Sequence, residues 1–334
     1  MSEPEVLARV EGALGHLTLN RPRSMNALTP TMIADLRTAL RDWAEDPAVT
    51  AVLIDGAGER GLCAGGDIKL LYAGIRGNTV VPLEFWTHEY EMNATVASFP
   101  KPFVAFMDGV VFGGGIGVSV HGSVRIVTER SSLAMPETAI GLAPDVGALY
   151  WYARMPGGLG TWAALTGARL NAGDAIAAGL ADLCWPLDGH ADLVDRMRTG
   201  WVPSVADGSA PPAASVGAAD RRWIDDAFTR DSIGEIAAAL TARPEPGAAA
   251  ALSTLRTMSP TAVVVTLAAI RRAAELPAVV DVLAQDLRVS SEFTRHPDLP
   301  EGIRAALIDK DRTPRWSPDR WEDVTDHAVA AYFA

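Results

Sequence analysis

The distribution of apolar and polar residues predicts alternating strands and helices over the first part of the chain. Two alternating, β-prone runs in residues 5–20 flank a Glu-Gly-Ala-Leu-Gly turn, a pattern typical of a β-hairpin. Thr29 followed by Pro30 is a favourable helix start, and the helix should run to about Glu45. The next segment, residues 49–58, has a continuous apolar centre. It indicates a strand buried on both faces, as in a parallel sheet.

The same order of elements then repeats. Helices are expected near residues 67–75 and 82–98, and strands near residues 102–109 and 124–129. Strands that alternate with helices at this spacing indicate crossover units. The predicted fold class is therefore α/β.

Composition divides the chain into three consecutive segments. Residues 1–200 are predicted to form the α/β core. Residues 201–218 are rich in Pro, Ala, Ser and Gly, which is typical of a linker. Residues 219–334 have apolar positions at intervals of three and four, so we expect a helical C-terminal region there.

Composition and charge narrow the classes of partner. The 334 residues are 49% hydrophobic and 21% charged, as in an ordinary globular protein. A formal net charge of -12 disfavours nucleic acid and anionic membranes as partners, because the long-range field repels phosphate. The first residues lack a secretory signal, and the apolar run 261–270 is shorter than the roughly 18 residues of a membrane span. We therefore expect a cytoplasmic protein with reduced cysteines.

Several common catalytic signatures are missing from the sequence. The segment Gly117-Val-Ser119-Val-His121 ends in His where a nucleophile elbow needs Gly. Neither the dinucleotide fingerprint nor a phosphate-binding loop is present. The six histidines show no metal-ligand spacing, and two cysteines form no metal motif, so no metal site is predicted.

Two glycine clusters are the first candidates for chemistry. Ala64-Gly65-Gly66-Asp67 and Gly113-Gly114-Gly115 each follow an expected strand and enter an expected helix. Glycine permits close backbone approach, and the first N–H groups of a helix have no partner within it. One N–H group from each cluster could together bind the oxyanion of an attacked carbonyl. The alternative is that these glycines serve only tight turns or close helix packing.

Two acids are the second candidates. The stretch PETAIGLAPDVG, residues 136–147, places Glu137 and Asp145 among small and apolar residues. Two nearby carboxylates in an apolar pocket do not both ionise easily, so one pKa should rise. The alternative is structural: Asp145 as the N-cap of a helix that starts at Val146, and Glu137 as the residue that opens a turn.

Several long motifs resemble the crotonase superfamily of enzymes that act on coenzyme A thioesters. They are LNRPRSMNAL, GLCAGGDIKLL, and the long segment from KPFVAFMDG to PETAIGLAPDVG. The resemblance covers almost the whole chain. Within the superfamily it is most similar to the 3-hydroxyisobutyryl-CoA hydrolases, because GGGIGVSVHG and MPETAIGLAPDVG occur together with HEYEMN and two tail motifs at 259–267 and 301–316.

This resemblance implies a fold and a substrate site. The fold would be a crotonase-type spiral of ββα units with a helical C-terminal part. The backbone N–H groups of Gly66 and Gly114 would form the oxyanion hole. Coenzyme A belongs to the substrate, so no separate cofactor is implied. The residues expected to lie along the coenzyme A moiety are Ala27, Ala64, Asp67 and Ile68.

The resemblance also implies a reaction. Enoyl-CoA hydratases carry a catalytic Glu at the position of Gly117, which here has no side chain. The hydrolases instead carry acids at the positions of Glu137, Asp145 and Glu89, with Glu91 as the alternative if that helix is misaligned. The implied reaction is hydrolysis of a short-chain 3-hydroxyacyl-CoA, with 3-hydroxyisobutyryl-CoA giving 3-hydroxyisobutyrate and CoA in valine catabolism.

Some questions stay open at this level. Glu137 could attack the thioester itself or act as general base on water, and Asp145 could bind the 3-hydroxyl group or handle the proton. The alternative activities are enoyl-CoA hydration or isomerisation, and a non-catalytic CoA-binding subunit is a more remote alternative. Crotonases often form homo-oligomers through C-terminal helices, which the longer tail here could alter.

Overall fold

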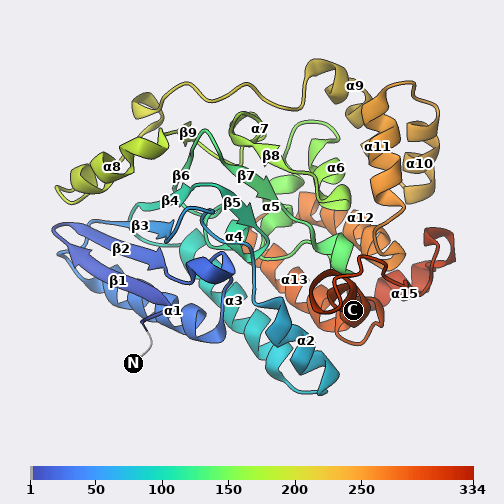
Figure 1. The fold of residues 1–334 in the computed structure, drawn as a ribbon, viewed down its shortest axis with the longest axis horizontal. Helices are drawn as coiled ribbons and strands as arrows, with labels where there is room; N and C mark the ends of the chain where they lie inside the picture. The colour runs from blue at the N-terminus through green and yellow to red at the C-terminus, as the bar shows by residue number, and fades with distance from the viewer. Residues whose placement is uncertain (1–2) are drawn as a thin grey trace. The chain divides into compact units, whose positions relative to one another are not determined.

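The computed structural model describes residues 3–334, which Figure 1 draws as a ribbon. These residues form two compact units. The units interleave along the chain. The first comprises Met1–Asp67, His88–Ala134 and Arg169–Ser215, and the second comprises Ile68–Thr87, Met135–Ala168 and Val216–Ala334. The predicted division into 1–200, 201–218 and 219–334 follows chain order, whereas the compact units do not.

The first unit is built on a six-stranded sheet. Its strands, in the order in which they pair, are β1 (Val6–Glu11), β2 (Leu14–Leu19), β3 (Ala51–Gly56), β4 (Phe103–Met107), β6 (Val124–Val127) and β9 (Leu183–Cys184). The pair β1 and β2 is antiparallel, so the predicted hairpin is confirmed. All other pairs are parallel, and β3 lies between β2 and β4 with its apolar centre buried. The strand predicted to be buried on both faces is therefore also confirmed.

Helices cover this sheet. In α1 (Pro30–Glu45) the Thr29 hydroxyl accepts a hydrogen bond from Met32 N at 3.1 Å, which confirms the predicted start. Helix α1 packs against β1, as Figure 1 shows in blue. Trp185 and residues of α8 (His190–Met197) join strand residues such as Leu53 and Phe106 in one apolar core. This burial of apolar surface stabilises the parallel sheet.

A smaller sheet in the first unit leads to one glycine cluster. Its strands are β5 (Val110–Phe112), β7 (Ser132–Ala134) and β8 (Leu170–Asn171). Strand β5 runs parallel to β7, and β7 is antiparallel to β8. The other helices of this unit are α4 (Gly114–Gly117), α7 (Ala172–Ala177) and the part of α3 (Val81–Ala97) from His88 onward.

The second unit is helical, and its helices from Ala218 onward confirm the helical region predicted for residues 219–334. Its apolar core includes Leu165, Trp223, Phe228 and Ile236. Among residues 3–334, no helix combines the length and the apolar composition that crossing a membrane requires. The α-helices are α2 (Ile68–Arg76), α5 (Ala148–Tyr152), α6 (Leu159–Thr166), α9 (Ala218–Phe228), α10 (Ile233–Thr241), α11 (Pro246–Leu255), α12 (Pro260–Glu275), α13 (Val279–Phe293), α14 (Asp298–Ile303) and α15 (Asp326–Ala331).

The segment predicted as a linker makes fixed contacts with the first unit over residues 201–215. Ser209 N donates to Cys184 O at 2.8 Å, and Asn171 Nδ2 donates to Ala213 O at 2.9 Å. These hydrogen bonds hold the segment along β9 and the start of α7. Residues from Val216 onward belong to the second unit.

Candidate functional site

The first glycine cluster leaves the N–H group of Gly66 outside the local backbone pairing. Leu28 and Gly66 form an isolated parallel bridge. Its hydrogen bonds run from Leu28 N to Gly65 O at 2.9 Å and from Asp67 N to Leu28 O at 2.8 Å. Gly65 has a φ of 112°, a conformation that residues with a side chain rarely adopt. The turn therefore needs glycine at position 65. It leaves the Gly66 N–H group outside the two hydrogen bonds of the bridge.

The second glycine cluster brings another amide to the same place. Gly113, with φ 51° and ψ -121°, is the N-cap of α4, and Gly114 is its first residue. The N–H of a first helical residue has no partner within the helix. A Cβ added to Gly114 would lie only 3.3 Å from Gly66 N. The two predicted oxyanion-hole residues are thus brought together within the first unit, and paired N–H donors are the arrangement that stabilises an oxyanion.

Glu89 lies beside these two loops. A Cβ on Gly114 would meet Glu89 Oε1 at 2.6 Å, and the Glu89 side chain is buried in α3. Burial, together with a smaller contribution from the Glu89 charge, raises the pKa of the Cys63 thiol in the same loop to about 12. Glu91, the alternative, is exposed and pairs with Arg37 at 2.7 Å. The face of α3 therefore places Glu89, and not Glu91, at the loops.

Asn93 is a buried polar residue that the sequence interpretation missed. It follows Glu89 by one helical turn on α3 and is 0% exposed. Neither its Nδ2 nor its Oδ1 has a hydrogen-bond partner among the described residues. Buried polar groups of this kind are rare and often mark binding sites. The spacing of four residues in HEYEMN was the available signal, because it places both side chains on one helix face.

The residues expected along coenzyme A fall on both units. Ala27, Ala64 and Asp67 lie in the first unit, whereas Ile68 begins α2 in the second. Arg21 connects two of them: its Nη1 donates to Ala27 O at 2.5 Å, and its Nη2 lies 3.3 Å from Asp67 Oδ2. These contacts fix the loop on which the Ala64 and Gly66 backbone lies.

The two acids of PETAIGLAPDVG lie together in the second unit. Glu137 begins a 3₁₀ turn, Glu137–Ile140, and both it and Asp145 are buried. Glu137 Oε2 has no hydrogen-bond partner among the described residues. Burial, and then the charge of Asp145, raises the pKa of Glu137 well above its usual 4.5. The expected rise in one carboxyl pKa is therefore confirmed.

A third buried acid, Asp286, joins this pair and was missed from the sequence. It lies on α13, is 2% exposed, and its Oδ2 accepts a hydrogen bond from Gly147 N at 2.8 Å. Burial and the charge of Asp145 raise its pKa well above the usual 3.8. The only signal was an acid on the apolar stripe of a helix, between Val282 and Val289. We call Glu137, Asp145 and Asp286 the carboxyl cluster.

Tyr152 on α5 adds a hydroxyl near the carboxyl cluster. It is 1% exposed, and its Oη has no hydrogen-bond partner among the described residues. Burial, followed by the charge of Glu137, raises the pKa of Tyr152. The hydroxyl therefore keeps its proton and remains a hydrogen-bond donor beside Glu137.

The sequence also allowed purely structural roles for the two acids, with Glu137 opening a turn and Asp145 capping a helix. The first of these roles is correct and the second is wrong. Glu137 does open a turn. Asp145, however, is not an N-cap: the N-cap of α5 is Gly147, and Val146 has a φ of 53°. A helix cannot start at Val146 because this residue has left-handed backbone geometry.

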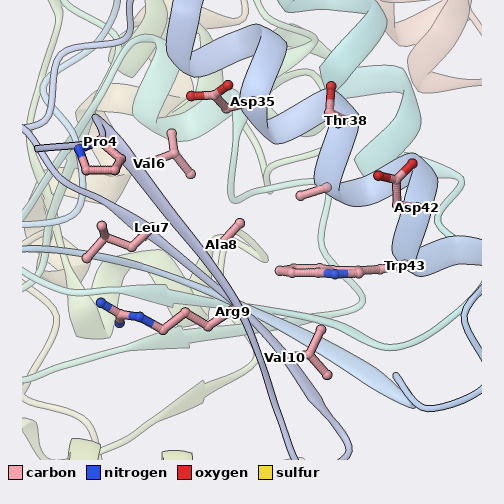
Figure 2. Close-up of a pocket in the computed structure, with 11 residues that line it drawn as sticks. Pro4, Val6, Leu7, Ala8, Arg9, Val10, Asp35, Thr38, Asp42 and Trp43 are labelled. Atoms are coloured by element: carbon pink, nitrogen blue, oxygen red, sulfur yellow. The ribbon is translucent and has the colours of Figure 1, made fainter.

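The groove drawn in Figure 2 contains none of the predicted site residues. It has a volume of about 520 Å³ and lies between β1 and α1. Leu7, Ala8 and Val10 line one side, and the ring of Trp43 lines the other. Within residues 3–334, no group of three His, Cys, Asp or Glu side chains is arranged to hold a metal ion.

Comparison with known proteins assigns the family. The profile of the enoyl-CoA hydratase/isomerase family matches residues 14–333. The chain is also 36% identical to the mitochondrial 3-hydroxyisobutyryl-CoA hydrolase of Rattus norvegicus, over 98% of this chain and 88% of that protein. The chain belongs to the crotonase superfamily. The resemblance found in the sequence motifs and the predicted fold class are both confirmed.

Solved structures agree with this crotonase assignment over the whole length. A carnitinyl-CoA dehydratase from Mycobacterium thermoresistibile superposes with a TM-score of 0.92 at 44% identity, covering 99% of this chain and 96% of the other. An enoyl-CoA hydratase from Rhodobacter sphaeroides 2.4.1 superposes with a TM-score of 0.94 at 41% identity, covering 99% and 97%. The crotonase fold therefore includes the helical C-terminal part.

The expected cytoplasmic location of this crotonase is contradicted. The curated relatives, including the rat protein, are named as mitochondrial hydrolases. Our expectation used net charge and the missing secretory pattern, and neither property distinguishes these compartments. Mitochondrial targeting segments are amphipathic and rich in Arg, so the apolar test for a secretory signal does not detect them.

Proposed function

We propose that this crotonase hydrolyses a short-chain 3-hydroxyacyl-CoA thioester, with 3-hydroxyisobutyryl-CoA as the first candidate. The products would be 3-hydroxyisobutyrate and CoA, a step of valine catabolism. The observation that carries the proposal is the buried pair Glu137 and Asp145 combined with Gly117, which offers no second catalytic Glu to a hydratase. The names of the 36% identical relatives support the same reaction.

In the proposed reaction, the N–H groups of Gly66 and Gly114 bind the thioester oxygen. Their donation to the oxygen strengthens as the carbonyl carbon becomes tetrahedral and the oxygen gains negative charge. One such donor contributes about 3 kcal/mol to the transition state. Glu89, buried beside Gly114, is proposed to contact the substrate from the same side.

Glu137 is proposed to start the cleavage in one of two ways. As a nucleophile, its carboxylate attacks the carbonyl carbon, the C–S bond breaks, and water then hydrolyses the anhydride. As a general base, it takes a proton from water, which attacks instead. Both routes need ionised Glu137, so its raised pKa makes the reaction faster as the pH rises. Asp145 would bind the 3-hydroxyl group or supply the proton to the CoA thiolate.

The decisive experiment measures free thiol released from 3-hydroxyisobutyryl-CoA by the purified protein. A panel of acetyl-, 3-hydroxybutyryl- and 3-hydroxypropionyl-CoA would rank the acyl groups. We expect the branched 3-hydroxyacyl thioester to give the highest kcat/KM. Loss of the thioester without free thiol, or no turnover of the whole panel, would refute hydrolysis.

Oxygen-18 labelling tests the nucleophilic route for Glu137. A single turnover in labelled water puts the isotope into the Glu137 carboxyl group if an anhydride forms and water attacks its Glu137 carbonyl. Label that appears only in the acid product is the result of the general-base route, and also of water attack on the acyl carbonyl of an anhydride, so only label in Glu137 decides, in favour of the nucleophilic route.

Hydration of an enoyl-CoA is the second candidate. The solved structures at 44% and 41% identity are named a carnitinyl-CoA dehydratase and an enoyl-CoA hydratase. Loss of the enoyl-thioester absorbance of crotonyl-CoA would reveal this activity. We expect little change there, because Gly117 has no side chain to activate water, although Glu137 matches the other acid of a hydratase pair.

A further inference from the structure

The turn that follows Asp145 has an unfavourable backbone conformation. Val146 has a φ of 53° and Gly147 a φ of 74°. Glycine adopts this left-handed region freely, but a buried β-branched residue such as Val146 does so only where its surroundings impose it. The direction of the Asp145 side chain depends on this turn, because Asp145 is its first residue.

A hydrogen bond from a distant helix reaches the turn. Gly147 N donates to Asp286 Oδ2 at 2.8 Å, and the two residues are 139 positions apart. Within the turn, Ala148 N donates to Asp145 O at 2.9 Å. Helix α13, which carries Asp286, packs against α5, which follows the turn. Asp286 therefore connects a C-terminal helix to the Asp145 turn.

An acidic side chain is a costly choice for a purely structural contact at this place. Asp286 is 2% exposed and lies close enough to Asp145 for their charges to repel. An amide could accept the same Gly147 hydrogen bond without that repulsion. A buried acid that faces a second acid is more typical of a functional site than of a core.

We propose that Asp286 is a positioning residue, which holds the Val146–Gly147 turn through the Gly147 N–H and so directs Asp145 toward the substrate. This inference rests on the proposed thioester hydrolysis, in which Asp145 takes part. Nothing in the sequence motifs or in the names of the relatives assigns a role to this position.

The test compares Asp286→Ala with Asp286→Asn in the full-length protein. The Ala variant loses the acceptor for Gly147 N. We expect its kcat for CoA release to fall about 100-fold with little change in KM, because displacing a catalytic group by roughly 1 Å has an effect of that size. The Asn variant keeps an acceptor and should retain most of the kcat. Asp281→Ala is the matched control, because Asp281 lies on the same helix and accepts a hydrogen bond from Ala278 N at 3.2 Å, at the N-terminal end of the helix.

Hydrogen exchange at the Gly147 amide provides a readout that does not depend on catalysis. We expect faster exchange in Asp286→Ala and nearly unchanged exchange in Asp286→Asn. Unchanged exchange and unchanged kcat in the Ala variant would overturn the proposal. If the Ala variant does not fold, an Asn variant with a kcat loss of about 100-fold would overturn it instead, because that variant keeps the acceptor.

The two proposals fail in different ways. If the wild-type protein releases no CoA from any thioester, the proposed function is wrong. The exchange experiment then still decides whether Asp286 holds the turn. If the wild-type protein hydrolyses the thioester and Asp286→Ala is fully active, only the role of Asp286 is wrong.

Discussion

The loops of the first unit and the carboxyl cluster of the second unit use opposite kinds of chemical group. The loops offer backbone N–H groups from Gly66 and Gly114, and a Cβ added to Gly114 would lie only 2.6 Å from Glu89 Oε1. The cluster offers the side chains of Glu137, Asp145 and Asp286, and each is buried. Backbone dipoles are present in every sequence, whereas three buried acids require a costly desolvation.

This difference shows which kind of site is visible in a sequence. A glycine such as Gly65, with φ 112°, is required by the turn itself, so the backbone conformation can be inferred from the sequence motif. For an acidic residue, the sequence gives the residue type but not its surroundings. Whether it is exposed or buried beside another acid depends on the helices that pack over it.

The largest expected effect comes from Glu137→Gln. Gln cannot attack a carbonyl or accept a proton from water, so kcat for CoA release should fall about 1,000-fold, within the range for removal of a general base or nucleophile. Free-thiol release measures it. Glu129→Gln is the control, because Glu129 is exposed and only accepts from Leu187 N at 3.2 Å. Near-normal turnover by Glu137→Gln would remove the cluster from the mechanism.

Gly114→Ala should cause the next largest fall in kcat. The substitution lies in the loops of the first unit and leaves the side chains of the carboxyl cluster unchanged. The new Cβ would lie 2.6 Å from Glu89 Oε1 and 3.3 Å from Gly66 N, so either the Glu89 side chain is displaced or the two N–H groups move apart. We expect kcat to fall about 100-fold, as for the loss of one oxyanion donor. Gly217→Ala is the control: φ is -71°, and the nearest atom to its Cβ is Asp220 Oδ2 at 4.0 Å. A fully active Gly114→Ala enzyme would contradict the oxyanion hole.

The pH dependence of stability tests the cluster without substrate. At a pH below the usual 4.5 of Glu137, both the folded and the unfolded chain hold the proton, and its contribution to stability is fully present. That contribution is lost as the pH rises through the raised pKa, because the unfolded chain ionises first. The stability of Glu137→Gln relative to wild type should therefore improve with pH, by at most about 1.4 kcal/mol per pH unit.

Urea-unfolding midpoints at several pH values between about 4 and 7.5 measure this change. Asp286→Asn should show a trend of the same sign, since burial and Asp145 also raise the pKa of Asp286. A difference between variant and wild type that stays constant over this range would contradict the raised pKa of Glu137.

The smallest expected effect comes from Thr29→Ala in the first unit. This change removes the acceptor for Met32 N at the start of α1, so the free energy of unfolding should fall by about 1 kcal/mol. Thermal or urea unfolding measures the loss, and Thr29→Ser should restore it. The kcat of CoA release should not change; a large fall in kcat would mean that α1 also shapes the oxyanion loops.

Much of the fold could be predicted because its signals are local. The hairpin of β1 and β2, the start of α1 at Thr29 and the buried strand β3 each follow from a few adjacent residues. The two glycine turns also followed, since Gly65 and Gly113 have positive φ angles that favour glycine, whereas the choice of Gly66 and Gly114 as the donors came from the family resemblance. Asp286 and Asn93 could not be recognised in the same way, because the first acts through Gly147, 139 residues away, and the second is defined by its burial.

The sequence by itself determined the superfamily, the α/β core, the glycine turns and the two acids of PETAIGLAPDVG. These are properties of short segments, in which backbone preference and side-chain periodicity act over a few residues. Only the tertiary structure decided that Glu89 rather than Glu91 lies at the loops, that Glu137 is buried with a raised pKa, and that Asp286 joins Asp145. Those properties come from desolvation and from hydrogen bonds between distant segments, and both exist only once the helices have packed.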